Sequence, residues 1–178
     1  MKWGYLLSGT RAAFGQAGGM HFELVDPLDH RELLAACVAV GGQRLGSCRM
    51  GKVLKTLRLY KKRLLVAARD ERGVAGFKLG FCERPGIFHS WLGAVALERE
   101  GQGIGRRLME LQHQHLTEQG YHKVRTGTRN QFKRMLILNL LSGFELVGVR
   151  QRRDGPHIQL EKRLTLAAKS PESSPERP

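Results

Sequence analysis

Three glycines at alternate positions separate an apolar segment from an amphipathic one: Gly101, Gly103 and Gly105. The apolar residues up to Leu97 favour a strand, and the spacing from Ile104 onward favours a helix. Glycine permits close approach of the backbone and a positive φ, and the first turn of a helix has N–H groups without intrahelical partners. The spacing therefore predicts a turn whose backbone surrounds an anionic group.

Two other phosphate-binding motifs do not fit this turn. A P-loop needs Gly-Lys-Ser/Thr at its end, and the dinucleotide fingerprint needs a third glycine where Arg106 stands. Arg106 and Arg107 fall in the first helical turn, where the helix dipole disfavours cations, so an anionic ligand would compensate them. The alternative is a tight strand-to-helix turn that binds nothing.

The composition indicates one soluble α/β domain with anionic partners. The chain has 178 residues, and no apolar run reaches the roughly 18 residues that span a bilayer. A formal net charge of +14 favours phosphates, nucleic acid or an acidic protein surface, unless it is only a solvated basic surface. Three cysteines without CxxC spacing favour free thiols, so we expect a reducing compartment, the cytoplasm. No metal-ligand spacing is present, and His113 and His115 point apart on a helix.

We expect a central domain over residues 20–165. Residues 1–19 show no period and are expected to be a disordered extension, and the proline-rich tail 166–178 is also expected to be disordered. The predicted order of elements is β, α, α, β, β, β, α, β, α, β, β. The strands are predicted at 21–25, 64–68, 74–82, 87–97, 123–128, 144–149 and 158–164, and the second and third helices at 53–60 and 104–119. The first helix is predicted to begin at Asp26-Pro27 and end at Gly41-Gly42, and the fourth to run from Asn130 to Leu141.

The glycine turn resembles the acetyl-CoA pyrophosphate loop of the GNAT N-acetyltransferases, whose motif is Arg/Gln-x-x-Gly-x-Gly/Ala. Gly103-Ile104-Gly105 match its end, and a second segment, Ser142-Gly143-Phe144-Glu145-Leu146-Val147-Gly148, is similar to a motif that follows the family's fourth helix. The resemblance covers about residues 21–164. The departure is Glu100, which stands at the Arg/Gln position. Its carboxylate is unfavourable near a pyrophosphate unless it turns away or Arg99 and Arg106 offset it.

The resemblance implies an α/β (α+β) fold: a mixed, mostly antiparallel central sheet flanked by about four helices, with a V-shaped splay between two central parallel strands. Pantetheine would lie in the splay against one strand, and the pyrophosphate would bind the N–H groups of the glycine turn. The implied cofactor-binding residues are Val95, Ala96, Leu97, Gly101, Gln102, Gly103, Ile104, Gly105, Arg106, Arg107 and Asn130. Asn130 is divided between this role and a plain helix cap.

The activity that the resemblance implies is direct transfer of an acetyl group from acetyl-CoA to a primary amine. The amine must lose a proton and the thiolate must gain one. The family's tyrosine position falls on Asn139, and an amide cannot release a proton at neutral pH. Asn139 therefore orients CoA, or water protonates the thiolate. A further alternative is that Asn139 is a polar side chain that faces solvent. A glutamate position falls on His89, a candidate base or a structural histidine. Strand alternation places His89, Trp91, Gly93 and Val95 on one face.

Two other functions stay open at this point. The basic residues between 44 and 63, with a stripe of Lys52, Lys55 and Arg58, suit a nucleic-acid-associated protein. A non-catalytic CoA-binding domain is the other, because Glu100 and Asn139 depart from the catalytic pattern. The amine acceptor, a small molecule or a protein, cannot be read from the chain, and a homodimer is expected only because dimers are common in the family.

Overall fold

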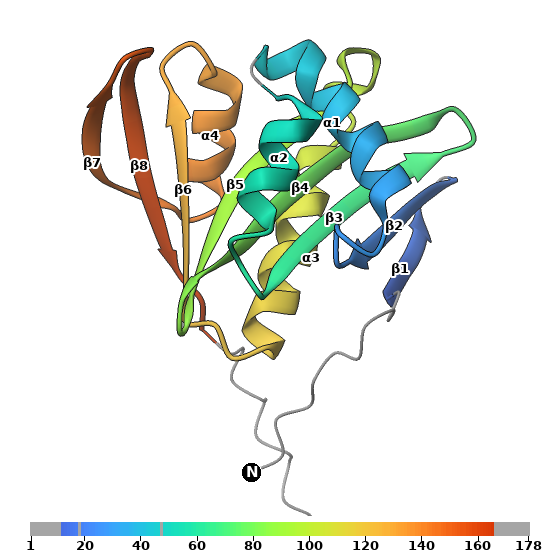
Figure 1. Cartoon of the computed structure of the whole chain (residues 1–178), viewed down its shortest axis with the longest axis horizontal. Helices are drawn as coiled ribbons and strands as arrows, with labels where there is room; N and C mark the ends of the chain where they lie inside the picture. Colours follow the sequence, from blue (N-terminus) through green and yellow to red (C-terminus); the bar gives the residue numbers. More distant parts are fainter. Residues whose placement is uncertain (1–11, 18, 47, 166–178) are drawn as a thin grey trace, which may run out of the picture.

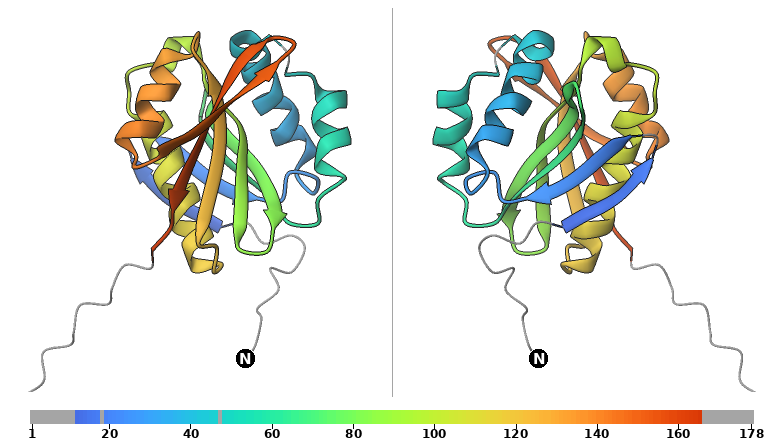
Figure 2. Two further views of the ribbon diagram at one scale, coloured as in Figure 1. Left: turned by 90° about the vertical axis from the view of Figure 1, so that its left-hand side faces the viewer. Right: turned by 90° about the vertical axis from the view of Figure 1, so that its right-hand side faces the viewer.

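The computed structural model describes residues 12–17, 19–46 and 48–165. Among these residues, eight strands form one sheet, with α1 and α2 on one face and α3 and α4 on the other (Figure 1 and Figure 2). The helices are α1 (Arg31–Leu45), α2 (Met50–Leu57), α3 (Ile104–Glu118) and α4 (Lys133–Leu141). The strands are β1 (Ala12–Ala17), β2 (Met20–Val25), β3 (Arg63–Asp70), β4 (Gly73–Arg84), β5 (Ile87–Val95), β6 (Lys123–Arg129), β7 (Glu145–Arg152) and β8 (Gly155–Arg163).

The strand order across the sheet is β1-β2-β3-β4-β5-β6-β8-β7. Within the part of the chain described, β5 and β6 are the parallel neighbours, and the other adjacent pairs are antiparallel. The predicted fold class, a mixed and mostly antiparallel sheet flanked by four helices, is therefore confirmed.

Two apolar clusters hold the helices to the sheet, one on each face. On the α1/α2 face, Leu34 and Leu57 pack with strand residues such as Phe77. On the α3 face, Leu108 and Leu111 pack with strand residues such as Phe88. These side chains are at most 2% exposed, and burial of each contributes on the order of 1.5–3 kcal/mol to folding. The two clusters fix β4 and β5 between the helix layers, which positions the cavity described below.

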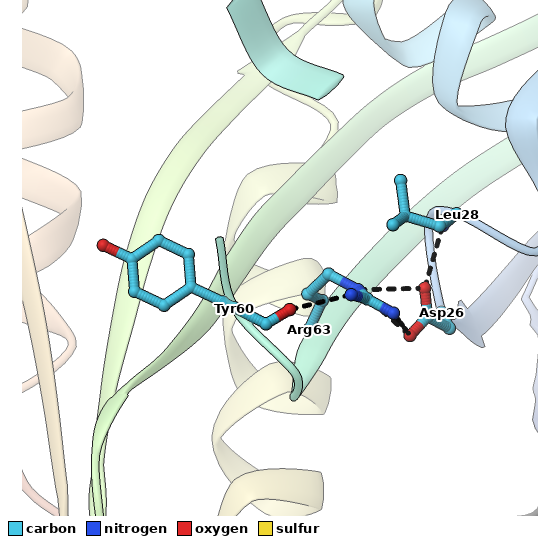
Figure 3. A network of polar contacts seen from close by, with 4 residues as sticks. All are labelled: Asp26, Leu28, Tyr60 and Arg63. Atoms are coloured by element: carbon cyan, nitrogen blue, oxygen red, sulfur yellow. Dashed lines mark hydrogen bonds and ion pairs between the residues drawn. The ribbon is translucent and has the colours of Figure 1, made fainter. Parts of the chain in front are cut away.

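The predicted start of the first helix was wrong. The Asp26 carboxylate accepts a hydrogen bond from the Leu28 N–H at 2.8 Å and pairs with the Arg63 guanidinium at 2.8 Å, while Arg63 also donates to the Tyr60 carbonyl at 2.7 Å (Figure 3). α1 begins only at Arg31. Asp26 thus ties the end of β2 to the start of β3, 37 residues away in sequence, and a local pattern does not reveal such a contact.

The predicted end of the same helix was also wrong, because α1 continues through Gly41 and Gly42 to Leu45. A Cβ at Gly41 would lie 2.9 Å from the Cys48 Sγ atom and 3.1 Å from the Phe77 ring. The glycine therefore serves close packing of α1 on its neighbours rather than termination. Gly46, whose φ is +62°, is the C-cap residue after Leu45.

The N-terminal extension was mispredicted at residues 12–17, which form β1 and pair antiparallel with β2. An edge strand pairs through backbone groups, which every residue carries, so a segment without an apolar period can still join a sheet. Residues 1–11, residue 18 and the tail 166–178 lie outside the described residues, so the disorder expected there stays a prediction.

Asn130 does not cap α4, which was a further error. α4 begins at Lys133 with Phe132 at its N-cap position. The strand predicted to reach Leu97 ends at Val95, and residues Leu97–Arg99 form a 3₁₀ turn before the glycine turn. The other predicted elements are present, with ends that differ by a few residues.

Candidate active site

β5 and β6 separate after a short parallel pairing. The paired positions run from Ile87 with Lys123 to Ser90 with Thr126, whereas β5 itself continues to Val95. On its other edge β5 stays paired with β4 over this stretch. The predicted splay between two central parallel strands is therefore present.

The divergence leaves backbone groups of β5 turned toward a gap. The Ala96 N–H donates to the Ala75 carbonyl next to β4 at 2.9 Å. Because successive N–H groups of a strand point to opposite sides, the N–H groups of Gly93 and Val95 point away from β4. Both residues line a cavity of about 1060 Å³ between the diverging strands. Unpaired N–H and C=O groups of a strand need a partner, and here a ligand can provide one.

The glycine turn forms one end of this cavity. Gly101 and Gly103 have φ values of +79° and +74°, which non-glycine residues rarely adopt. Gly103 is the N-cap residue of α3 and provides no side-chain cap, so the N–H groups of the first turn lack intrahelical partners. A Cβ at Gly105 would lie 3.3 Å from Leu138 of α4. The turn thus combines exposed N–H donors with close helix packing, as an anion site requires.

Six of the eleven predicted cofactor-binding residues line the cavity: Val95, Gly101, Gly103, Ile104, Gly105 and Arg106. The other five, which do not line it, are Ala96, Leu97, Gln102, Arg107 and Asn130. Ala96 is buried, Leu97 is 56% exposed, and Arg107 pairs with Glu110 on its own helix at 3.4 Å. The structure therefore brings together the glycines and the start of α3 rather than the whole predicted set.

Glu100 lies between two arginines that the sequence did not point to. Its carboxylate pairs with Arg44 in the last turn of α1 and with Arg134 in the first turn of α4. Arg99 and Arg106, the partners expected from the sequence, do not pair with Glu100. Arg99 pairs with Asp70 instead. Arg44 and Arg134 lie 56 and 34 residues from Glu100 in sequence. The carboxylate is thus compensated, and it joins two helices on opposite sides of the cavity.

The rest of the cavity lining is strongly basic. The lining cations are Arg44, Lys52, Lys78, Arg99, Arg106, Arg129, Lys133, Arg134, Arg150 and Arg152, against the two acids Glu100 and Asp154. Asp154 is itself paired with Arg129 at 3.1 Å. A concave surface lined by one sign of charge concentrates ligands of the opposite sign. The cavity therefore favours an anionic ligand.

His89 lines the cavity on the α1/α2 side of the sheet. Its ring lies 5.4 Å from the Phe81 ring, which stacks on Tyr60 at 3.7 Å and lies 5.8 Å from Trp91. Burial lowers the pKa of His89, and the charges of Arg125 and Arg152 lower it further, while Glu83 opposes them. The imidazole is therefore neutral at pH 7 and keeps a lone pair that can accept a proton.

The predicted alternation along β5 fails at a bulge. Leu79 pairs with Leu92 and Gly80 pairs with Ser90, so Trp91 is an extra residue on β5. Trp91 packs with the cluster on the α1/α2 face, whereas Val95 packs with the cluster on the α3 face. His89, Trp91, Gly93 and Val95 therefore do not share one face, which corrects the prediction.

Asn139 lies away from the cavity. It is 1% exposed and does not line the cavity, and its Oδ1 atom has no hydrogen-bond partner among the described residues. The alternative that this side chain faces solvent is therefore wrong. After Arg134, α4 contributes the apolar side chains of Met135 and Leu138 to the lining. Lys78 of β4, which sequence reasoning did not single out, lines the cavity although it is only 7% exposed.

No protein-family model matches the sequence, and no curated protein matches it. Solved structures match it in fold. The ribosomal-protein-S18-alanine N-acetyltransferase from Escherichia coli is 17% identical, with 84% of this chain and 97% of that chain covered and a TM-score of 0.69. A GNAT family acetyltransferase from Elizabethkingia anophelis with acetyl-CoA bound is 18% identical, with coverages of 83% and 100% and a TM-score of 0.64.

A third match is an aminoglycoside 6'-N-acetyltransferase complexed with coenzyme A, 17% identical, with coverages of 81% and 95% and a TM-score of 0.61. The chain has the GNAT acetyltransferase fold. The resemblance found in the sequence implies that acetyl-CoA binds between the diverging strands β5 and β6 and at the turn before α3. None of the described helices combines the length and the hydropathy of a membrane-spanning helix. No group of three or more metal-binding side chains occurs among the same residues.

The charges around His89 predict its titration. In the intact protein we expect His89 to titrate below 6.5, because burial and two arginines disfavour its charged form. Glu83→Gln should lower its pKa further, and Arg152→Gln should raise it. NMR titration of the histidine ring protons measures each shift. Glu71→Gln, an exposed carboxylate in another turn, is the control that should leave His89 unchanged. A pKa at or above 6.5, or one that ignores both substitutions, would contradict this description.

Proposed function

We propose that the chain is an acetyl-CoA-dependent N-acetyltransferase that transfers an acetyl group directly from the thioester to a primary amine. The observation that carries this proposal is the unpaired edge of β5, which ends at a glycine turn with free N–H donors. A neighbour of the same fold contains acetyl-CoA, and another contains coenzyme A. Sequence identities of 18% and 17% are too low to transfer the acceptor of a neighbour to this chain. The proposed activity therefore rests on the geometry of this site.

The lining of the cavity favours one direction for acetyl-CoA. Its pyrophosphate would accept hydrogen bonds from the N–H groups between Gln102 and Arg107, and its pantetheine would bond the backbone of β5 at Gly93 and Val95. Arg106, Lys133 and Arg134 line the same end and would add charge near the phosphates. Backbone recognition explains why the side chains of Leu97 and Gln102 can face solvent.

His89 is the candidate base. It lies near the start of β5, whereas the glycine turn follows the end of that strand. Because it is neutral at pH 7, it can take a proton from an ammonium directly or through water. The positive charges of the lining also favour the neutral form of a bound amine, because they raise the free energy of a second cation. The amine would thus reach the thioester in its nucleophilic form.

The neighbours' names mention a ribosomal-protein alanine and an aminoglycoside, which are chemically unlike. The basic lining disfavours a polycation and is compatible with an amine that also carries a negative charge. A cytoplasmic location, suggested by three free cysteines, and a homodimer belong to the same proposal.

Isothermal titration with acetyl-CoA tests the cofactor. The parent protein should bind one equivalent, and Gly103→Asp should weaken binding at least about tenfold, because a carboxylate would face the pyrophosphate. Gly120→Asp is the matched control, since Gly120 has φ +78° and open space, like Gly103. It imposes the same backbone strain at the other end of α3. Absence of binding at millimolar acetyl-CoA, or equal binding by Gly103→Asp, would refute the proposal.

The Glu100 ion pairs predict a second effect. Glu100→Gln should tighten acetyl-CoA binding about three- to tenfold, because it removes a carboxylate from the phosphate end and frees Arg44 and Arg134. The gain should shrink in high salt. Glu98→Gln removes the same charge from an exposed side chain outside the cavity lining and should change affinity little. Weaker binding by Glu100→Gln would show instead that the bridge between α1 and α4 supports the site.

A further inference from the structure

Lys78 is a buried lysine on the α3 face of the sheet. It lies on β4, opposite Val66 of β3 and Gly93 of β5. Gly76, two residues earlier, faces Ile104 and Leu108 of α3, and alternation along the strand places Lys78 on the same face. At a buried position in the middle of a sheet, an apolar residue would stabilise the fold better than a lysine does.

Its side chain reaches the cavity beside Gly93. A Cβ at Gly93 would lie 3.4 Å from the Lys78 Cγ atom and 3.2 Å from the Phe77 carbonyl oxygen. The aliphatic stem of Lys78 thus lies against a β5 residue without a side chain, in the part of β5 that has left β6. Both residues line the cavity.

No hydrogen bond or ion pair of the ammonium group is found within the described part of the chain, and its charge helps to lower the pKa of His113 of α3. Burial is the sole influence found on the pKa of Lys78, which it lowers to about 8, and no charge or hydrogen bond opposes it. An unpaired buried cation is costly. It is tolerated where a ligand supplies a negative charge during function, and functional sites are where such groups gather.

Other groups near the gap are less suited to release a proton. The Ser90 hydroxyl donates to Gln112 at 2.8 Å, and the Thr126 hydroxyl donates to the Ser90 carbonyl at 2.9 Å. The Thr128 hydroxyl lines the cavity, but a neutral hydroxyl releases its proton far less readily than an ammonium. α4 contributes Met135 and Leu138 and buries Asn139 elsewhere. His89 lies on the other face of the sheet and is the candidate base that takes a proton from the amine.

We propose that the Lys78 ammonium protonates the sulfur of the CoA leaving group. This inference rests on the proposed acetyl transfer. The acceptor nitrogen forms a bond to the acetyl carbon, the carbon–sulfur bond breaks, and its electron pair goes to sulfur. Lys78 gives one proton to that sulfur, and the amine loses one proton to His89 or water. Solvent returns a proton to Lys78, so the overall products are the acetylated amine and CoA thiol.

The proton affinities match this role. An alkyl thiol such as that of cysteine has a pKa near 8.5, close to the value of about 8 for Lys78. Lys78 is therefore mostly protonated at pH 7, and transfer to a thiolate is nearly balanced in free energy. An arginine in its place would keep the positive charge but could not release the proton.

The thiol pKa of bound CoA tests the contact without a known acceptor. The probe is CoA itself, saturating the full chain, and the ultraviolet absorbance of its thiolate is followed against pH. In the parent protein, Lys78 should hold this thiol pKa at least about one unit below its value in Lys78→Met, where burial alone raises it. Lys78→Arg should behave like the parent here, because it keeps the charge.

Lys55→Met is the control, since Lys55 is exposed on α2 and does not line the cavity. It should leave the thiol pKa unchanged. Titration calorimetry of each variant with CoA establishes that it folds and binds. Equal thiol pKa values in the parent and in Lys78→Met, with CoA bound to both, would overturn the role of Lys78 while leaving the proposed function intact. Failure of the parent to bind CoA would overturn both.

Mass spectrometry provides a second, independent check. After incubation of the parent with acetyl-CoA at pH 8, Lys78 should stay unmodified, because its proton lies toward the sulfur rather than its lone pair toward the carbonyl carbon. Stoichiometric acetylation of Lys78 would overturn the proposal, since the amine would then act as a nucleophile and not as an acid.

Discussion

The structure depends on one interruption of backbone pairing: β5 remains paired with β4 to its end, but it leaves β6 after Ser90. The N–H groups of Gly93 and Val95 then have no strand to bond, although they lie at the centre of an eight-stranded sheet. Two apolar clusters, one on each face, hold this opening in place. In the proposed function, a ligand with an extended, amide-containing chain would complete the sheet there.

The charges around the opening favour one orientation of a bound ligand. Cations predominate in the lining, and Glu100 is held by Arg44 and Arg134. In the proposed function, the phosphates would bind at the end where the N–H groups of the first turn of α3 are free. On the two faces of the gap lie a neutral imidazole, His89, and a buried ammonium, Lys78, both with a lowered pKa. In the proposed reaction they would act as proton acceptor and proton donor from opposite sides of the same space.

The sequence predicted what local spacing controls. The glycine turn and α3 followed from Gly103 and the period after Ile104, and the mostly antiparallel sheet with its splay between two parallel strands followed from the resemblance. Contacts between distant segments were missed: Asp26 binds Arg63 instead of capping a helix, and Gly41 packs on Phe77 instead of ending one. For the same reason, neither the partners of Glu100 nor the burial of Lys78 could be read from spacing. Both depend on which strands and helices become neighbours.

Hydrogen exchange of the β5 amides tests most directly whether the cofactor takes the place of a strand. By NMR, acetyl-CoA should slow exchange of the Gly93 and Val95 amides at least about tenfold, because the pantetheine accepts their hydrogen bonds. The 3′-phosphoadenosine diphosphate half alone should occupy the glycine turn and leave these two amides unprotected. The Ala94 amide, which points toward β4, should change little in either case. Unchanged exchange at Gly93 and Val95 with acetyl-CoA bound would contradict the account.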